Sequence, residues 1–348
     1  MKVTLTNEIL SYITEIEHNR YKVSSVKLSK PVMNRLRKNS KKKSSYASNK
    51  IEGNPLSEKQ VDEVIERDER KHYLKPEQEV RNYFLALNFL EEKVSKKEKF
   101  SQKLILDVQK LVEKGASKEK IGLRGPMPPG VLFAVYDSKT GNPDYIPPEY
   151  CDIPELLDEL VEYVNTTDDH PLIVAAVVHY QLVTIHPFED GNGRTARLLS
   201  GYIMDLNGYG FNGIGSLEEY FAYDIDEYYE SIQMGLPALY YSGRENPPHP
   251  EIWINYFLRM VKLYSGKVCD LQLASEEEDI AGSLSFLKGK EKELLQFLIR
   301  NYRGEFTPIE VSRELSVSNK TVINRLAVLV KNGFAVPVFA NQDRKSVV

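Results

Sequence analysis

The sequence predicts a mainly α-helical protein with one small β-hairpin and a separate C-terminal winged helix-turn-helix domain. Three observations support this fold class. Most segments place apolar residues three and four positions apart, residues 130–147 break that pattern with turn formers, and the last 68 residues differ in charge from the rest. With 348 residues, 41% apolar and 28% charged, the chain can bury a core and divides into two or three domains.

Helices are predicted first at residues 76–96 and 101–115. Their apolar residues recur at helical spacing, and in the second helix Ser101 is placed to cap the start and Gly115 to end it. Residues 130–147 then read "GVLFAVYDSKTGNPDYIP", in which two short β-type stretches flank a turn-rich segment. They predict a hairpin that projects from a helical body.

A second pair of helices is predicted around residue 190. Residues 171–185, "PLIVAAVVHYQLVTI", are rich in β-branched side chains, but fifteen residues are long for a strand and Pro171 suits a first helical turn. We therefore expect a buried helix. The following stretches, "HPFEDGNG" and "RTARLLSGYIMDLNG", predict a loop and another helix.

The C-terminal stretch 281–348 holds eleven Lys and Arg and six Asp and Glu, a net charge of +5 against −4 for the whole chain. The polar residues 262–282 are the best candidate boundary before it. Thr307 and Glu310 predict a capping box, Ser318 predicts a second helix, and "FAVPVF" with "RKSVV" predicts a short wing. Winged helices contact DNA or protein, and the residues placed to meet a major groove are Asn319, Lys320, Thr321, Asn324 and Arg325.

Other classes of protein are disfavoured by composition. The start of the chain has no signal-peptide pattern and no apolar run is long enough to span a membrane, so we expect no membrane contact and a cytoplasmic location. Cys151 and Cys269 match no metal-ligand or redox spacing and are predicted to be buried packing residues. The basic stretch Arg35–Lys43 could contact nucleic acid or phosphates, but a solvated helix end or loop is the preferred interpretation.

The loop "HPFEDGNGR" combines the parts of a phosphoryl or nucleotidyl transfer site. Glycines at a helix start let a phosphate approach the exposed backbone N–H groups, and Arg194 and Arg197 share one helix face. His186 could take a proton from an attacking hydroxyl, and Asp190 supplies an oxygen ligand for magnesium. His179 shares a helical face with His186, but a core histidine is preferred there to a metal ligand, and Phe188 is predicted to anchor the loop.

The string "HPFEDGNGRTAR" resembles the Fic family signature, His-Pro-Phe-x-Asp/Glu-Gly-Asn-Gly-Arg-x-x-Arg, at every defined position. The resemblance extends over roughly residues 30–262. It implies a Fic-type helical bundle that transfers AMP from ATP to a protein hydroxyl with Mg²⁺. The corresponding domains are an N-terminal helical region with an inhibitory helix (1–95), a Fic catalytic core (96–265) and the winged-helix domain (281–348).

The family's roles carry over by position. The resemblance implies that His186 deprotonates a target Tyr, Thr or Ser, and that Asp190 holds Mg²⁺. It also implies that phosphates bind at the amides of Gly191, Asn192 and Gly193, at the Asn192 side chain, and at Arg194 (β) and Arg197 (γ). Residues 130–145 match the family's flap, which aligns the target, and Tyr228 and Tyr229 resemble its adenine-side aromatic pair, although both could equally be core. Gly193 favours AMP transfer, because Doc-type kinases have lysine there.

A second stretch, "SNKIEG", resembles the family's inhibitory motif, Ser/Thr-x-x-x-Glu-Gly/Asn, through Ser48, Glu52 and Gly53. A carboxylate at Glu52 that pairs with Arg197 would deprive the γ-phosphate of its partner. We therefore predict a self-inhibited enzyme that adenylylates an unknown protein target and itself. The alternatives are a DNA-binding regulator whose Fic-like body senses nucleotide, and net removal of AMP through Glu52. The resemblance also admits a homodimer.

Overall fold

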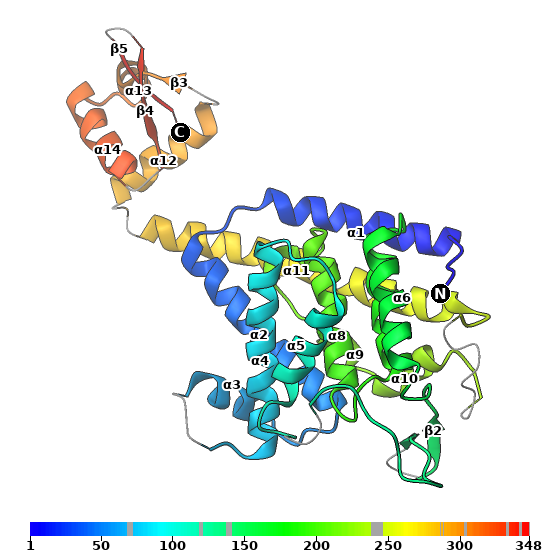
Figure 1. Cartoon of the computed structure of the whole chain (residues 1–348). Helices are drawn as coiled ribbons and strands as arrows, with labels where there is room; N and C mark the ends of the chain where they lie inside the picture. Colours follow the sequence, from blue (N-terminus) through cyan, green and yellow to red (C-terminus); the bar gives the residue numbers. More distant parts are fainter. Residues whose placement is uncertain are drawn as a thin grey trace. The chain divides into compact units, whose positions relative to one another are not determined.

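The computed structural model describes residues 1–67, 72–117, 121–136, 141–237, 246–285, 287, 289–302, 305–331, 334–340 and 343–347. They form two compact units, Met1–Leu273 and Ala274–Val348. The described residues are mainly helical, as the sequence predicts (Figure 1).

The first unit is a helical body with one small hairpin (Figure 1). Its elements are α1 (Asn7–Ser25), α2 (Lys30–Ile51), α3 (Glu58–Glu66), α4 (Lys75–Ser95), α5 (Gln102–Glu113), β1 (Val135–Tyr136), β2 (Pro143–Tyr145), α6 (Ile153–Thr166), α7 (Pro171–Ile185), α8 (Asn192–Leu206), the short 3-10 turn η2 (Phe211–Gly213), α9 (Glu218–Phe221), α10 (Ile225–Gln233) and α11 (Pro250–Ser285).

The core is built around α7, which spans the predicted residues 171–185. All its residues except Pro171 and Val183 are buried, because apolar side chains occur on every face of the helix. It packs most extensively on α8. Two side chains bond its carbonyl groups: Ser200 Oγ donates to Ala175 at 2.9 Å and Trp253 Nε1 donates to Ala176 at 2.8 Å. The motif loop at the end of α7 therefore starts from a rigid support.

The other predicted helices of this unit are also confirmed. α4 and α5 lie within residues 75–113, and the Ser101 hydroxyl accepts a bond from the Leu104 backbone N–H at 3.2 Å, which is the expected cap. α4 and α5 both pack on α8, so segments from before residue 114 reach the motif (Figure 1). The N-terminal helices share one apolar core with the helices that follow.

The predicted hairpin is present but short. β1 and β2 pair antiparallel, with Val135 opposite Tyr145 and Tyr136 opposite Pro143. Residues 137–140 of its turn lie outside the described residues. The Tyr145 hydroxyl donates to the Thr184 carbonyl oxygen at 2.6 Å, so the second strand is fixed beside the end of α7.

The basic stretch Arg35–Lys43 does not lie at a solvated helix end or in a loop, and that interpretation was wrong. It lies inside α2, where successive lysines pair with three other helices. Lys41 contacts Glu91 of α4 at 2.5 Å, Lys42 contacts Glu66 of α3 at 2.7 Å and Lys43 contacts Glu219 of α9 at 3.1 Å. Each of these three lysines has a carboxylate partner on a neighbouring helix, so the pairs help to hold α2 in place.

The second unit contains the predicted helix-turn-helix elements. They are α12 (Gly289–Asn301), β3 (Glu305–Phe306), α13 (Pro308–Glu314), α14 (Asn319–Lys331), β4 (Val336–Ala340) and β5 (Asp343–Val347). The Thr307 and Glu310 capping box forms, the Ser318 hydroxyl accepts from the Thr321 N–H at 3.2 Å, and the sheet order is β3-β5-β4. The winged-helix assignment itself stays a prediction.

Two further expectations have mixed outcomes. The two units divide between Leu273 and Ala274, and α11 runs through residues 262–282 without a break; the predicted domain bounds stay a prediction. Cys269 is buried, whereas Cys151 is exposed in the turn before α6, so the prediction for Cys151 was wrong. None of the helices in the described part of the chain is both long and apolar enough to cross a membrane.

Candidate active site

The loop between α7 and α8 begins at His186, which ends α7 in a left-handed conformation with φ of 49°. That backbone turn is uncommon for a residue with a side chain, and it turns the imidazole out of the helix. The Nδ1 atom lies 3.3 Å from the Val183 carbonyl oxygen, so Nδ1 carries the proton and Nε2 is left as an acceptor. Burial lowers the pKa of His186 to about 4, which keeps the imidazole neutral and leaves Nε2 without a proton.

Arg124 holds this loop in place, and the sequence analysis did not identify it. Its backbone N–H donates to the Pro187 carbonyl oxygen at 2.9 Å, and its Nε donates to the His186 carbonyl oxygen at 2.9 Å. The guanidinium also bonds the Pro148 carbonyl oxygen and lies over the Phe133 ring. The segment before the hairpin is thereby tied to the candidate base.

The middle of the loop is anchored as predicted by Phe188, which is completely buried. Asn192 fixes it further, because its side-chain Oδ1 accepts from the Phe188 N–H at 3.0 Å and its Nδ2 donates to the Phe188 carbonyl oxygen at 2.8 Å. The Asn192 side chain is therefore engaged with the loop itself. These two bonds leave the backbone N–H of Asn192 and the second N–H of its side-chain amide for the phosphate contacts expected at this residue.

The start of α8 forms the expected anion-binding end of a helix. Gly191 caps it with φ of 82°, a conformation that favours glycine. The amides of the first turn have no partner inside the helix and carry the positive end of its dipole. Gly193 lies in that turn, and a Cβ atom there would stand 2.4 Å from the Glu52 Oε1 atom. The absence of a side chain at Gly193 is thus what lets Glu52 come so close.

Arg194 is buried and forms an ion pair with a carboxylate that the sequence analysis missed. Its Nη2 lies 2.9 Å from Glu113 Oε1, at the end of α5, and 3.2 Å from Asp190 Oδ1. Glu113 is completely buried, and desolvation raises the pKa of its carboxyl group. Nε and Nη1 of Arg194 have no hydrogen-bond partner among the described residues, although Nη1 lies 4.0 Å from Glu79 Oε1, so these donors remain for an anion.

Arg197, one turn further along α8, is bound by the predicted inhibitory residues. Its Nε donates to Ser48 Oγ at 2.8 Å, and its Nη2 donates to the Ser48 carbonyl oxygen at 3.1 Å and to Glu52 Oε1 at 2.5 Å. Burial works against the charged form, but Glu52 together with Tyr228 and Tyr83 outweighs it and raises the pKa of Arg197. Ser48 and Glu52 reach the same guanidinium because four residues separate them on α2.

Gly53 explains why α2 ends where it does. It adopts φ of 79° directly after Glu52, and its N–H donates to the Lys50 carbonyl oxygen at 3.0 Å. A glycine in this conformation is a common helix terminator. Glu52 thus lies directly after the last residue of α2, and its side chain is one-third exposed, whereas the side chain of Arg197 is almost fully buried.

The two tyrosines of α10 differ in environment. Tyr228 is buried against Phe221 and Trp253, and its hydroxyl lies 2.8 Å from His179 Nε2 and 3.3 Å from Arg197 Nη1. Tyr229 is 43% exposed. Tyr229 therefore presents the exposed ring, and the adenine contact stays a prediction. His179 is a buried core histidine that bonds Tyr228, in line with the preferred interpretation.

Magnesium is the metal that the resemblance implies. No group of three His, Cys, Asp or Glu side chains in the described ranges is arranged to hold a metal ion. A Mg²⁺ site needs only one or two protein carboxylates when phosphates supply the other oxygens. The carboxylate of Asp190 is 30% exposed at the start of α8, so this donor fits a phosphate-bound Mg²⁺.

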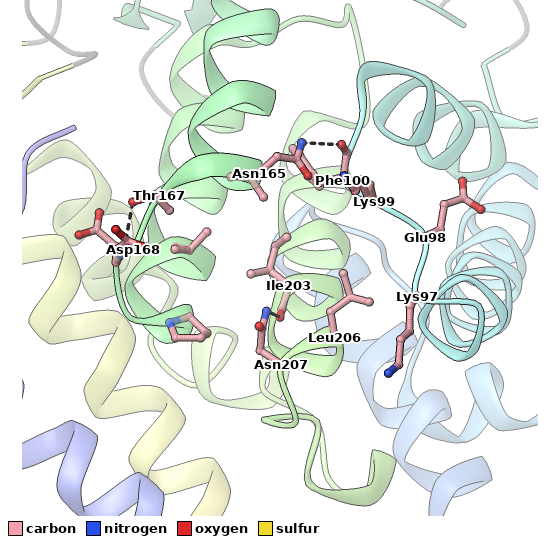
Figure 2. A pocket seen from close by; sticks show the side chains of 14 residues that line it. Lys97, Glu98, Lys99, Phe100, Asn165, Thr167, Asp168, Ile203, Leu206 and Asn207 are labelled. Atoms are coloured by element: carbon pink, nitrogen blue, oxygen red, sulfur yellow. Dashed lines mark hydrogen bonds between the residues drawn. The ribbon is translucent and has the colours of Figure 1, made fainter.

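A cavity of about 450 Å³ lies away from these residues. It is lined by both signs of charge, including Lys97, Lys99 and Asp168, and by Leu206 and Asn207 at the far end of α8 (Figure 2). The fifteen residues of α8 span about 20 Å, so the motif is roughly that distance away. The cavity is therefore separate from the candidate active site.

Comparison with known proteins agrees with this geometry. The profile of the Fic/DOC family matches residues 98–204. Protein adenylyltransferase fic-1 of Caenorhabditis elegans is 46% identical over 67 residues, which cover 18% of this chain and 13% of that protein. Protein adenylyltransferase Fic of Drosophila grimshawi is 26% identical over 204 residues, 57% of this chain and 40% of that protein. The matched regions thus span less than half the length of these relatives.

The fold is shared with solved Fic structures. A Fic family protein from Desulfovibrio desulfuricans G20 matches with a TM-score of 0.62 at 20% identity, over 99% of this chain and 97% of that one. Residues 134–508 of C. elegans Fic-1 match with a TM-score of 0.58 at 23% identity, over 78% of this chain and 73% of that one. Residues 98–204 therefore constitute a domain of the Fic/DOC family.

Proposed function

We propose that this protein is a self-inhibited protein adenylyltransferase that uses ATP and Mg²⁺ to transfer AMP to a hydroxyl group of a protein. The observation that carries the proposal is the ion pair between Glu52 and Arg197 at the start of a helix with free backbone amides. A guanidinium placed for a polyphosphate is here bound by a carboxylate of the same chain. The relatives named adenylyltransferases support a transferase in general terms.

In the proposed reaction the target hydroxyl oxygen bonds to the α-phosphorus of ATP. The bond from this phosphorus to the oxygen that bridges to the β-phosphate breaks, so AMP remains as an ester on the target and pyrophosphate leaves. His186 takes the hydroxyl proton at Nε2, which its low pKa keeps unprotonated. The Mg²⁺ held by Asp190 would offset the negative charge of the leaving pyrophosphate.

The remaining residues position the nucleotide. The α8 amides of Asn192 and Gly193 are available to phosphate oxygens, as are the two Arg194 nitrogens that have no hydrogen-bond partner among the described residues. Arg197 serves the γ-phosphate only when Glu52 moves away. The hairpin, tied to the loop through Tyr145 and Arg124, would align the target segment by main-chain pairing.

Transfer of label from α-phosphate-labelled ATP to protein tests the proposal. We expect little labelling by the wild type, labelling of the protein itself or of a lysate band by Glu52→Gly, and none by Glu52→Gly combined with His186→Ala. Retained ATP binding without labelling in all three proteins would contradict it and favour a nucleotide-sensing regulator. Net removal of AMP is tested on pre-modified target protein, where release that survives Glu52→Gly excludes a role for Glu52.

The second unit supports a separate proposal, that α14 contacts DNA. Asn319, Lys320 and Asn324 are exposed on its first turns. Exposed Ile323 and Val328 on the same helix would instead suit a protein partner. Binding of random-sequence duplexes that weakens steeply with salt and with Lys320→Glu supports DNA contact, and absence of binding at low salt contradicts it. The target protein, a homodimer and a cytoplasmic location stay predictions.

A further inference from the structure

The Arg197 guanidinium has hydrogen-bond partners from two helices. α2 supplies three of the contacts, through Ser48 Oγ, the Ser48 carbonyl oxygen and Glu52. The remaining one is Tyr228 of α10, whose hydroxyl lies 3.3 Å from Nη1. In the described part of the chain, Tyr228 is thus the single partner of Arg197 that does not belong to the inhibitory helix.

The Tyr228 hydroxyl is itself oriented by His179 of α7. The two atoms Oη and Nε2 are 2.8 Å apart, and both side chains are buried. Burial lowers the pKa of His179 well below its usual range, and the charge of Arg197 lowers it further, so the imidazole is neutral. Because a guanidinium only donates, Tyr228 accepts from Arg197 and is left with one proton to donate. The neutral His179 can accept that proton at Nε2.

The orientation of His179 is fixed by packing. Its ring lies against Trp253 at 4.9 Å between centroids and against Phe221 at 5.6 Å in an edge contact. Its Nδ1 atom has no hydrogen-bond partner among the described residues. Within the described residues, the polar contact of the His179 side chain is therefore its hydrogen bond to Tyr228.

We infer that Tyr228 and His179 are positioning residues that keep Arg197 directed at the nucleotide once Glu52 is removed, and thereby give the enzyme its preference for a triphosphate. This inference rests on the proposed function, in which Arg197 meets the γ-phosphate. Without the Tyr228 contact, a released Arg197 keeps only its bonds to Ser48 on α2, the helix that carries the brake. The triphosphate preference then weakens although the ring and the core packing remain.

The experiment compares the dissociation constants of ATP and ADP, measured by calorimetry with Mg²⁺, in the Glu52→Gly protein with and without a second change. ADP lacks the phosphate that Arg197 would bind, so the ratio of the two constants isolates this contact. We expect Tyr228→Phe to reduce the preference for ATP roughly ten-fold, because a hydrogen bond to a charged group contributes about 1.5 kcal/mol or more. The expected loss is in ATP binding, with ADP binding unchanged.

Two further variants separate positioning from packing. His179→Leu should lower the preference as Tyr228→Phe does, whereas His179→Gln, whose amide oxygen can accept from Tyr228, should retain it. Tyr202→Phe is the matched control. Tyr202 is a buried tyrosine on α8 whose hydroxyl bonds the Glu98 carbonyl oxygen and does not contact Arg197. Circular dichroism confirms that each protein is folded.

The outcomes separate a failure of the proposed function from a failure of the inference about Tyr228 and His179. A Glu52→Gly protein that binds ATP no better than ADP contradicts the proposed role of Arg197 and with it the proposed function. A Glu52→Gly protein that prefers ATP, and keeps this preference equally with Tyr228→Phe and Tyr202→Phe, leaves the proposed function intact and overturns the inference. In the protein that retains Glu52, neither Tyr228→Phe nor Tyr202→Phe should alter the ratio of the dissociation constants of ATP and ADP, because Glu52 occupies Arg197.

Discussion

Under the proposed function, the strength of self-inhibition can be estimated from the contact between Glu52 and Arg197. A hydrogen bond between charged groups contributes about 1.5–3 kcal/mol, and the one-third exposure of Glu52 places this pair near the lower end. Removing the carboxylate by Glu52→Gly should therefore strengthen ATP binding about ten-fold. The backbone tolerates the change, because Glu52 has φ of −84° and ψ of 10° outside the regular helix, where glycine costs little.

The measurement is the dissociation constant of ATP, together with the rate of label transfer at limiting ATP. Glu52→Gln retains a neutral acceptor for Arg197 and should give an intermediate increase. Glu66→Gln is the matched control, because it removes a carboxylate partner of Lys42 on α2 and leaves Arg197 untouched. The reasoning is refuted if Glu52→Gly binds ATP as weakly as the wild type, or if Glu66→Gln strengthens binding equally, since loosening of α2 would then be the cause.

Three further predictions concern the protonation of His186, the backbone conformation of Gly191 and the buried carboxylate of Glu113. Because its pKa is lowered to about 4, His186 stays unprotonated on acidification. The rate of AMP transfer by Glu52→Gly should therefore stay level from pH 8 to 5 and fall near pH 4. A fall centred near pH 6.5, the usual pKa of histidine, would contradict this. Gly191→Ala should lower the melting temperature, because its Cβ would meet Glu113 Oε1 at 2.6 Å with φ of 82°, whereas Gly201→Ala on α8, with open space around it, should not. Glu113→Ala should cost about 3 kcal/mol in urea unfolding, because it removes the fully buried carboxylate beside Arg194 and leaves the guanidinium with the more exposed Asp190. Glu91→Ala, at a more exposed pair with Lys41, should cost about 1 kcal/mol or less; equal costs would argue against a buried ion pair.

The parts of the fold that the sequence predicts are those decided by local chemistry. The Ser101 cap, the helix from Pro171 to Ile185 and the Thr307 capping box all depend on residues within one or two turns of each other. The contact between Glu52 and Arg197 was also predicted, although the two residues are 145 positions apart; its inhibitory role stays a prediction. The prediction of this contact came from two motifs whose resemblance to one family implied that they meet, and helical periodicity alone would not have paired them.

The missed residues depend on tertiary packing. Glu113 lies 81 positions from Arg194 and Arg124 lies 62 positions from the carbonyl group of His186 that it binds. In the sequence Glu113 precedes Lys114 and Gly115 at a helix end, a pattern typical of an exposed residue. Likewise, the polar run 262–282 suggested a break, yet Tyr264 and Val268 keep helical spacing and are buried, so α11 continues.

Both arginines of the motif pair with a carboxylate, but burial gives the two pairs different roles. Glu113 is completely enclosed beside Arg194, so separating this pair would leave the buried Glu113 carboxylate without its cationic partner at a cost of several kcal/mol. Glu52 is one-third exposed, so its carboxylate can return to water when it leaves Arg197. The structure therefore favours a fixed Arg194 and a releasable Arg197. Under the proposed function, regulation would then act on recognition of the terminal phosphate of ATP, while the rest of the phosphate site stays assembled.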